Sequence, residues 1–499
     1  MTLNEALSQL TALERELTAY RHAMGVLSYD GETVAPRNSA AARGETMGVL
    51  SGVVHEKLTA PATREIIDTL LARADELDAP ARRRAELLKE DSDELTLIPA
   101  EEYTAYQRLI SDSSAVWHEA KLKSDYAAFA PYLEKIIDYN RRLAARKDAS
   151  KPAYDVLLDI YEKGLTAARL DPFFALLRQE LTPVVLAVSE RPRPEDGFVS
   201  RFYPIDRQRV FLDRVLEIMG VNRDDLSAGE TEHPFMDAFN KHDVRIATHY
   251  HADNILSNLF SVLHEGGHAL YELGIADEMQ GTLLAGGSAN SIHESQSRLY
   301  ENLLGRSRAF CEVILPVLRE FFPGQMAGVT PEKLYRAANL AEPTLVRTEA
   351  DELTYSMHVM VRYELEKAMI AGDLKVADIP GEWNRMYRDY LGVEVPDDRR
   401  GCLQDCHWGT GLVGYFPSYA LGNAYGAQMF RRMEGEIDVW GAVRAGDFRP
   451  VNRWLDEKVH RFGRLLTPGE LIENACGGPF DPHVYVDYLK GKYGEMYGV

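Results

Sequence analysis

Apolar residues recur at spacings of three and four along most of this 499-residue chain. The first such segment places Leu3, Leu7, Leu10, Leu13 and Leu17 on one stripe, which is the pattern of an amphipathic helix. Similar stripes recur near residues 63–88, 103–123, 129–146, 207–219, 299–320 and 349–371. Alternating patterns typical of strands are few and short, and the best candidates are residues 197–205 and 243–250. The spacing therefore predicts a mainly α fold with a small sheet.

Charge and composition narrow the class of protein. Apolar residues make up 45% of the chain and charged residues 27%, which are ordinary values for a globular protein. The formal net charge is −21, so the surface repels phosphate backbones and anionic lipids, and we expect neither a nucleic-acid partner nor a membrane. The first residues show no signal peptide, and the four cysteines form no dense framework. These features predict a cytoplasmic protein.

A Pro-rich stretch at residues 189–197 is the clearest loop in the sequence. It could separate an N-terminal helical lobe, roughly residues 1–190, from a second part, roughly residues 200–499. A loop within one domain explains the stretch equally well. We therefore treat residues 1–499 as a single unit with these two parts.

The segment HEGGH places His264 and His268 four residues apart, with Glu265 after the first histidine. Residues 254–273 have helical spacing, with Asp253 as the expected N-cap and Gly274 as the expected end. On a helix both imidazoles share one face, about 6 Å apart, and can reach one Zn²⁺. Glu265 can then bind a water beside the metal without ligating it. The two glycines cost the helix about 2 kcal/mol relative to alanine, which indicates close approach of a substrate or another helix.

A catalytic zinc usually takes three protein ligands and leaves one position open. Glu294 is the strongest candidate for the third, because it lies near the start of a second amphipathic helix. Ser291 and Glu294 fit a helix-capping box equally well, so spacing alone leaves both roles open. The pair His249 and His251 could ligate a metal from a strand, although such pairs are more often surface or core features.

Six motifs in sequence order resemble those of the carboxypeptidase Taq (M32) family of metallopeptidases. They are HPF at 233–235, DVR at 243–245, HEGGH at 264–268, HESQ at 293–296, VRTEAD at 346–351 and GCLQDCHW at 401–408. The chain departs from the family pattern at Ala247, where threonine is expected, and mildly at Val346. Near the N-terminus, Tyr29 replaces a tryptophan before Asp30. Six motifs in order are far more specific than any one of them.

The resemblance implies that His264, His268 and Glu294 bind the metal and that Glu265 is the general base. It implies a saddle-like helical fold with a deep groove, similar to neurolysin, with a small sheet near the active site. It also implies a homodimer that removes single residues from peptide C-termini with broad preference. Zn²⁺ is the implied metal, with Co²⁺ or Mn²⁺ as alternatives.

Hydrolysis of a peptide also needs a hydrogen-bond donor for the developing oxyanion. His407, in the GCLQDCHW motif, and Tyr419 are the candidates, and Tyr415 is an alternative to Tyr419. Ordinary core packing explains either tyrosine equally well.

A carboxypeptidase must hold a terminal carboxylate, and a fixed arginine does so through two parallel hydrogen bonds. Arg347 is the leading candidate, with a helix-surface ion pair to Asp351 as the structural alternative. Arg245 is the second candidate, and Asp243 offers it a structural partner.

Two other functions stay open. An oligopeptidase or dipeptidyl carboxypeptidase could use the same metal centre, and would release paired residues or cut internally. A helical peptide-binding protein without catalysis is the third hypothesis, and the intact HEGGH segment with Glu294 argues against it.

Overall fold

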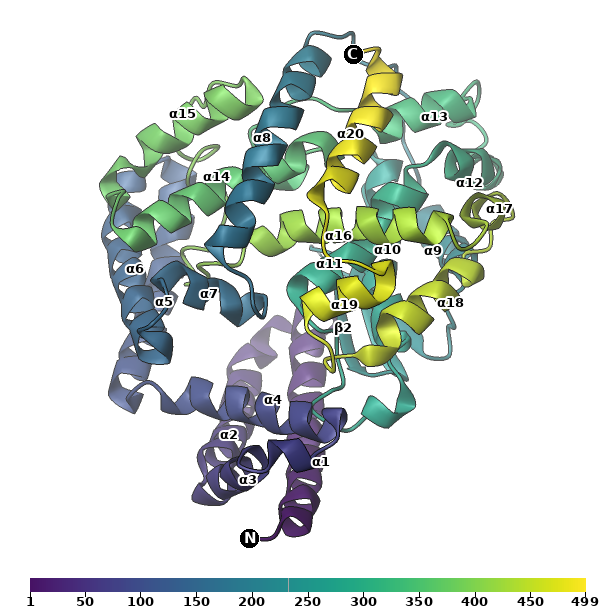
Figure 1. Ribbon diagram of the computed structural model, residues 1–499. Helices are drawn as coiled ribbons and strands as arrows, with labels where there is room; N and C mark the ends of the chain where they lie inside the picture. The colour runs from purple at the N-terminus through teal and green to yellow at the C-terminus, as the bar shows by residue number, and fades with distance from the viewer. Residues whose placement is uncertain (232) are drawn as a thin grey trace.

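The computed structural model describes residues 1–231 and 233–499 (Figure 1). Helices dominate this part of the chain and accompany one three-stranded sheet, which confirms the predicted fold class. None of its helices is both long and apolar enough to cross a membrane. The helices before the sheet are α1 (Leu3–Thr33), α2 (Ala40–Thr59), α3 (Pro61–Leu71), α4 (Ala79–Thr96), α5 (Ala100–Lys123), α6 (Tyr126–Asp148), α7 (Ala153–Tyr161), α8 (Ala167–Ser189) and α9 (Ile205–Met219).

The helices after the sheet run through the centre of the molecule and reach both of its sides in Figure 1. They are α10 (Ile255–Leu273), α11 (Asn290–Arg298), α12 (Arg308–Phe321), α13 (Pro331–Ala338), α14 (Glu352–Ala371), α15 (Ile379–Leu391), α16 (Pro417–Glu434), α17 (Val439–Arg444), α18 (Arg449–Lys458), α19 (Pro468–Cys476) and α20 (Pro482–Tyr497). A π-helix at Leu299–Gly305 continues α11 without a break.

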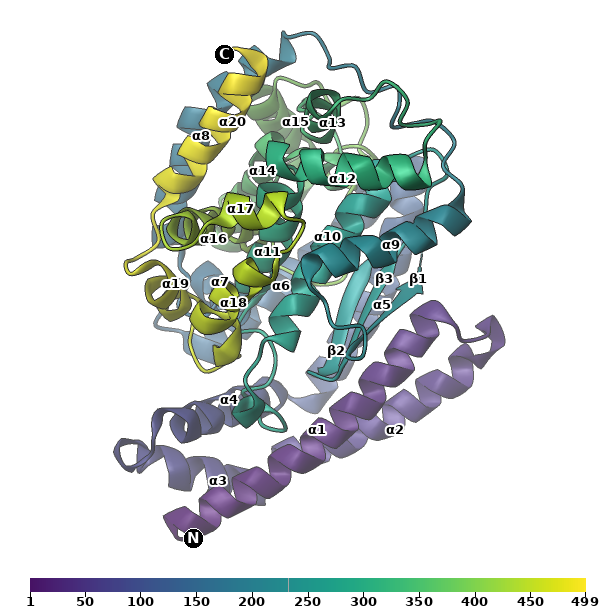
Figure 2. The same cartoon turned by 90° about the vertical axis from the view of Figure 1, so that its right-hand side faces the viewer.

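The sheet has the order β1-β3-β2, with β1 at Leu226–Glu230, β2 at Phe235–Asn240 and β3 at Asp243–Thr248. The central strand β3 runs parallel to β1 and antiparallel to β2. Figure 2 shows the sheet between α1 on one side and α9 and α10 on the other. The predicted strand at 243–250 is confirmed as β3. The predicted strand at 197–205 is wrong, because turn hydrogen bonds such as Val199 N–H to Asp196 C=O replace sheet pairing there.

Helix α10 carries the HEGGH segment and is almost entirely buried. Its N-cap is Asn254, whose side chain accepts the Ser257 N–H, so the predicted cap at Asp253 is wrong by one residue. The two glycines allow close helix packing. A Cβ on Gly266 would lie 2.6 Å from the Met219 side chain of α9, and one on Gly267 would lie 2.8 Å from the Ser297 Cα of α11. Of the two predicted reasons for the glycines, approach of a substrate or of another helix, the structure shows the approach of other helices.

Helix α11 lies between α10 and α16. Glycines on α16 allow α11 and α16 to pack closely. A Cβ on Gly422 would lie 2.6 Å from the Cβ of Glu294. One helical turn further, a Cβ on Gly426 would lie 3.0 Å from the Ser295 carbonyl oxygen. The backbone that carries Glu294 is thus held between glycine-containing faces of two helices.

Buried apolar residues form a large core and a smaller second one. The smaller core joins α1, α3 and α4 to Ile275, Met279, Leu283 and Leu284 from the segment after α10. Within it, the fully buried Glu14 pairs with Arg84 and accepts the Leu283 N–H. Residues of α6 to α8 belong instead to the large core, together with α10. The lobe boundary near residue 190 stays a prediction.

Candidate metal centre

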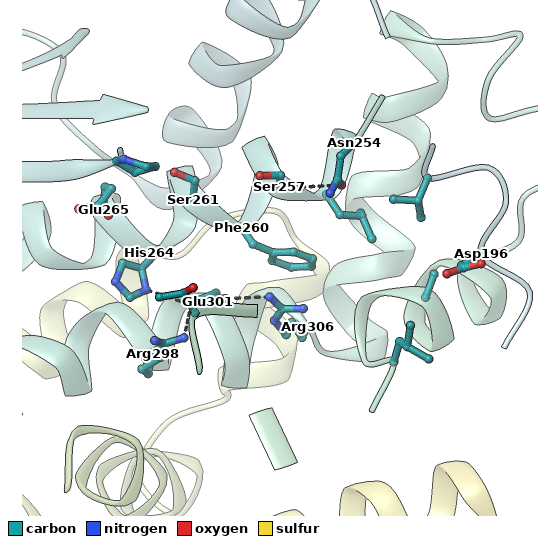
Figure 3. Close-up of a pocket in the computed structure, with 16 residues that line it drawn as sticks. Asp196, Asn254, Ser257, Phe260, Ser261, His264, Glu265, Arg298, Glu301 and Arg306 are labelled. Carbon is teal, nitrogen blue, oxygen red and sulfur yellow. Dashed lines mark hydrogen bonds and ion pairs between the residues drawn. The ribbon is translucent and has the colours of Figure 1, made fainter. Parts of the chain in front are cut away.

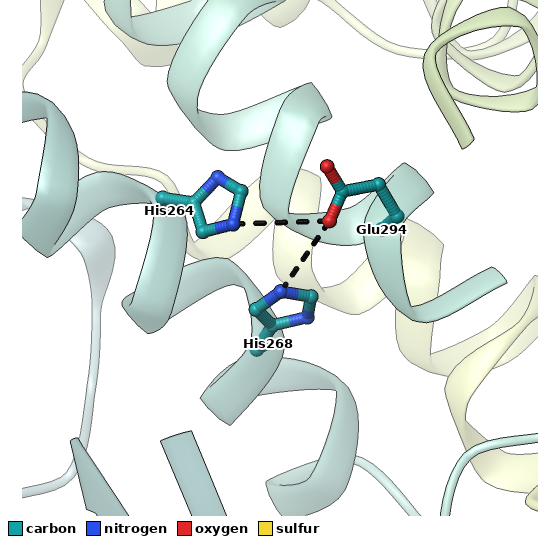
Figure 4. Close-up of side chains that lie close together, drawn as sticks. All are labelled: His264, His268 and Glu294. Atoms are coloured by element: carbon teal, nitrogen blue, oxygen red, sulfur yellow. Dashed lines mark ion pairs between the residues drawn. The ribbon is translucent and has the colours of Figure 1, made fainter. Parts of the chain in front are cut away.

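Three side chains from α10 and α11 meet around one point, as Figure 4 shows. Glu294 Oε2 lies 3.8 Å from His264 Nε2 and 3.8 Å from His268 Nε2. One ligand atom from each of the three residues lies within 4.8 Å of the others. Two imidazole nitrogens and one carboxylate oxygen are a donor set typical of catalytic zinc. Tetrahedral ligands at zinc bond lengths stand about 3.4 Å apart, so the two histidine–glutamate distances are within a few tenths of an ångström of those in a zinc site.

The arrangement around Glu294 excludes the capping alternative. Helix α11 has no side-chain N-cap hydrogen bond, and Ser291 bonds instead to the buried Glu162 through both its N–H and its hydroxyl. Glu294 Oε1 accepts a hydrogen bond from Arg298 Nε at 2.7 Å, while Oε2 faces the two histidines. Arg298 therefore fixes Oε1, while Oε2, which also accepts a hydrogen bond from the Ser297 hydroxyl at 3.3 Å, is the oxygen available to a metal.

The Nδ1 atom of His264, which faces away from Glu294, contacts a carboxylate. His264 Nδ1 lies 2.9 Å from Glu301 Oε2, and Glu301 also pairs with Arg298 and Arg306. Burial raises the pKa of Glu301, but Arg298, His264 and Arg306 outweigh it and hold that pKa well below its usual value. Glu301 is thus ionised and orients the His264 ring with Nε2 towards Glu294.

The Nδ1 atom of His268, which faces away from Glu294, contacts a further histidine, His293. His268 Nδ1 lies 3.1 Å from His293 Nδ1, and His293 Nε2 lies 2.7 Å from Glu272 Oε1. Burial, with the nearby His264 and His293, lowers the pKa of His268 well below its usual value. The neutral imidazole is the form that binds a metal.

Glu265 and His264 line a cavity of about 660 Å³ that runs along the N-terminal half of α10 (Figure 3). Its walls include Ser257, Ser261, Phe260 and, from the HPF motif, Pro234. Burial raises the pKa of Glu265 to about 7. A carboxyl group with that pKa, at the edge of a cavity beside the candidate metal ligands, suits proton transfer near neutral pH.

His407 and Tyr419 lie together, as the sequence analysis grouped them. Tyr419 is in the first turn of α16, one turn before Gly422, and its hydroxyl lies 3.3 Å from His407 Nε2. Burial lowers the pKa of His407 to about 4, and burial raises the pKa of Tyr419. Tyr415 packs against both rings. Both candidates are therefore neutral at pH 7, and Tyr419 keeps its proton.

Arg347 is buried, with 5% of its surface exposed, and its partner is Asp405 rather than Asp351. Its Nε and Nη2 donate to Asp405 Oδ1 at 3.0 and 2.9 Å, and its Nη1 donates to the Tyr355 hydroxyl. Asp351 instead caps α14 by accepting the Leu353 and Thr354 N–H groups. Tyr355 also lies under the Arg298 guanidinium, so Arg347 connects through Tyr355 and Arg298 to Glu294.

Arg245 and the HxH pair lie away from the three metal-site side chains. Arg245 forms a two-point ion pair with Asp243 and packs on Tyr29 of α1, on the face of the sheet opposite Val244 and Ile246. His249 follows β3 and bonds to Ser257, and its ring contacts His251. Among the residues that the structure describes, His264, His268 and Glu294 are the group suited to hold a metal.

The partners that orient the three side chains were not predicted from the sequence; they are Arg298, Glu301 and the pair His293–Glu272. For the first two a signal existed, because Arg298 and Glu301 follow Glu294 by four and seven residues and so share its helical face. The connection from Glu272 to His293 has no such signal, since it spans a loop.

The whole chain is similar to proteins of one known family. The sequence profile of the carboxypeptidase Taq (M32) metallopeptidase family matches residues 9–493. Carboxypeptidase 1 of Bacillus subtilis is 37% identical over 487 residues, which cover 97% of each chain. Thermostable carboxypeptidase 1 of Thermus thermophilus is 35% identical over the full length of both chains. The crystal structure of the M32 carboxypeptidase from Deinococcus radiodurans R1 superimposes with a TM-score of 0.96 at 38% identity, covering 99% of this chain and 100% of that one. The chain therefore belongs to the carboxypeptidase Taq (M32) metallopeptidase family.

Proposed function

We propose that this M32 metallocarboxypeptidase releases single amino acids from the C-termini of peptides with broad preference, using Zn²⁺ held by His264, His268 and Glu294. The observation that supports this best is the convergence of the three side chains beside Glu265 at the edge of a cavity. Co²⁺ and Mn²⁺ are alternatives that the same donor set can hold. When bound, such an ion polarises the scissile carbonyl and makes water more acidic.

Glu265 is the proposed general base. It takes the proton from the attacking water and returns it to the leaving amine. Its pKa of about 7 in the buried site suits both steps. Glu265 lies next to His264 on α10 and lines the cavity, which supports this role.

Tyr419 is the proposed hydrogen-bond donor to the oxyanion, with His407 as its partner and Tyr415 as the alternative donor. Because the pKa of Tyr419 is raised, the hydroxyl carries its proton at neutral pH. Its position one turn before Gly422, which touches Glu294, supports a place near the metal ligands.

Arg347 is the proposed anchor for the terminal carboxylate of the substrate. Asp405 and Tyr355 occupy three of its five N–H groups, which leaves two for a ligand. Gln404 holds its backbone by accepting the Arg347 N–H at 2.8 Å. Arg245, the second candidate, already donates two parallel hydrogen bonds to Asp243, so a structural role suits it better.

A timed digest tests the order of release. A peptide incubated with the zinc-loaded protein should lose one residue at a time from its C-terminus, measured by mass spectrometry. Paired losses or internal cuts would instead support the oligopeptidase or dipeptidyl carboxypeptidase alternative.

The role of Glu265 gives the first prediction. Glu265→Gln should lower kcat by about 10²–10⁴-fold, because the amide cannot accept the proton of water. Metal analysis of the same sample should find one zinc per chain, as in the wild type, since Glu265 is not among the three ligands. Unchanged hydrolysis by this variant would refute the mechanism, and loss of zinc would refute the assignment of ligands.

Two further properties stay predictions. The homodimer implied by the family resemblance can be checked by light scattering of the purified protein. The cytoplasmic location can be checked by cell fractionation.

A further inference from the structure

We propose that Glu272 and His293 are positioning residues for His268, which fix its tautomer and ring orientation through two consecutive hydrogen bonds. This inference rests on the proposed function, because it takes His268 as a metal ligand. The observation is a chain of contacts: His268 Nδ1 to His293 Nδ1 at 3.1 Å, and His293 Nε2 to Glu272 Oε1 at 2.7 Å.

The proton positions in this chain follow from its geometry. His268 can ligate through Nε2 only if its own proton is on Nδ1, so Nδ1–H donates to His293 Nδ1. His293 must then carry its proton on Nε2, which donates to Glu272. A carboxylate is the acceptor that ends the chain without a further proton. Each imidazole therefore has one defined tautomer.

The surrounding loop holds both members of the pair in place. The Gly287 N–H donates to Glu272 Oε1 at 2.9 Å, which fixes the carboxylate. A Cβ on Gly287 would lie 2.3 Å from His293 Cδ2, so the loop closes directly over the ring. The Ser288 N–H donates to the Tyr271 hydroxyl, and the Tyr271 ring packs on His293. The His293 ring is thus enclosed and cannot turn without displacing the loop.

The two imidazole ligands differ in how they are supported. His264 bonds directly to Glu301, whose charge is shared with Arg298 and Arg306. Glu272 has no arginine or lysine within ion-pair distance in residues 1–231 and 233–499. The hydrogen bond to His293 is the contact that connects Glu272 to His268, and through it the carboxylate makes His268 a better electron donor to a cation. Removing that charge should weaken metal binding more than it weakens the fold.

The test measures metal binding by the protein rather than activity alone. Metal-free wild type, Glu272→Gln and Glu272→Ala are titrated with Zn²⁺ in competition with a chromophoric chelator. We expect Glu272→Gln to bind about 10-fold more weakly, because the amide oxygen still accepts from His293, and Glu272→Ala up to about 100-fold more weakly. The visible spectrum of the Co²⁺-loaded variants should shift, since the ligand field of His268 changes.

Controls separate this role from a structural one. Glu278→Gln removes an exposed carboxylate just beyond the end of α10 and should bind Zn²⁺ like the wild type. The thermal unfolding midpoint of metal-free Glu272→Gln should stay within a few degrees of the wild type. Wild-type zinc affinity and an unchanged Co²⁺ spectrum in Glu272→Ala would overturn the proposal.

A ligand variant distinguishes failure of this proposal from failure of the proposed function. His268→Ala should lose tight zinc binding if the metal site is correct. If His268→Ala loses zinc and Glu272→Ala does not, the positioning role is wrong and the metal site stands. If His268→Ala binds zinc like the wild type, the metal site itself is wrong.

Discussion

At the scale of single residues, the buried carboxylates fall into two groups according to their partners. Asp405 lies between Arg347 and Arg362, and although burial raises its pKa, the two guanidinium groups hold that pKa well below its usual value. Glu366 instead receives hydrogen bonds from neutral donors: the Tyr154 hydroxyl, the Trp408 indole and the Gly414 N–H. Burial therefore raises the pKa of Glu366 to about 7.

This difference predicts how stability depends on pH. The pKa of Glu366 is about 7 in the folded protein and 4.5 in the unfolded chain. Between these two pH values, the folded protein holds a proton on Glu366 that the unfolded chain has lost. Glu366 should therefore make the free energy of unfolding fall as pH rises from 4.5 to 7, and Glu366→Gln removes the contribution of this residue. Relative to wild type, the variant should gain about 2–3 kcal/mol between pH 5 and pH 8.

Urea unfolding of the metal-free proteins at several pH values measures the effect. Glu278→Gln, which removes an exposed carboxylate, should follow the wild-type curve. Parallel curves for Glu366→Gln and wild type would contradict the raised pKa.

Residue positions could be predicted from sequence where the spacing is local. The four-residue separation places His264 and His268 on one helical face whatever surrounds them. The partner of Arg347 could not be found this way, because Asp405 is 58 residues away and only the folded chain brings them together. The structural alternative for Arg347, an ion pair with Asp351, is wrong because that carboxylate accepts hydrogen bonds from the backbone of the next helix.

At the scale of elements, the site depends on how closely three helices pack. Gly267 brings α10 against α11, and Gly422 and Gly426 bring α16 against its other side. A helix interior normally favours alanine over glycine by about 1 kcal/mol. At these positions glycine is preferred instead, because the Cβ of an alanine would lie too close to the neighbouring helix.

Two glycines on one helix provide a matched pair for testing this packing. In Gly422→Ala the new Cβ meets the Glu294 side chain, so zinc affinity and kcat/KM should fall about 10-fold or more. In Gly426→Ala the Cβ meets the Ser295 carbonyl at 3.0 Å, so the unfolding midpoint should fall while zinc affinity changes less. Chelator competition and thermal unfolding measure the two effects. Equal zinc affinities in Gly422→Ala and wild type would show that α16 does not set the position of Glu294.

The periodicity of apolar residues predicted the helices well, but it predicted the helix ends and the strands of the sheet less accurately. The apolar stripe of residues 254–273 matches α10 closely, whereas the cap is one residue later than predicted because Asn254 is better placed to accept the Ser257 N–H. Strands β1 and β2 were not predicted at all. They are short and only partly buried, so they lack the alternation that the first four residues of β3 show.

At the scale of the whole molecule, the two cores should differ in stability. The smaller core of α1, α3 and α4 contains few buried residues, and in α2 just Leu58 is buried. The large core contains α10, α11 and α16, which are buried over most of their length. Local opening is easiest where few apolar contacts hold an element.

Native-state hydrogen exchange measured by mass spectrometry tests this difference. Peptides from α1 to α4 should exchange through local opening, at free energies well below that of global unfolding. Peptides from α10, α11 and α16 should exchange at close to the global value. Equal protection of both groups would show that the small core unfolds only with the rest of the molecule.

The position of Glu14 has a consequence for the order in which the chain can fold during synthesis. This carboxylate has no exposed surface, and one of its donors, the Leu283 N–H, lies 269 residues downstream. Ile275, Met279, Leu283 and Leu284 also complete the apolar core of the same helices. While a ribosome is still making the first half of the protein, the N-terminal helices therefore have an incomplete interior and a carboxylate short of a donor. Their final packing must wait until the segment after the HEGGH helix has emerged.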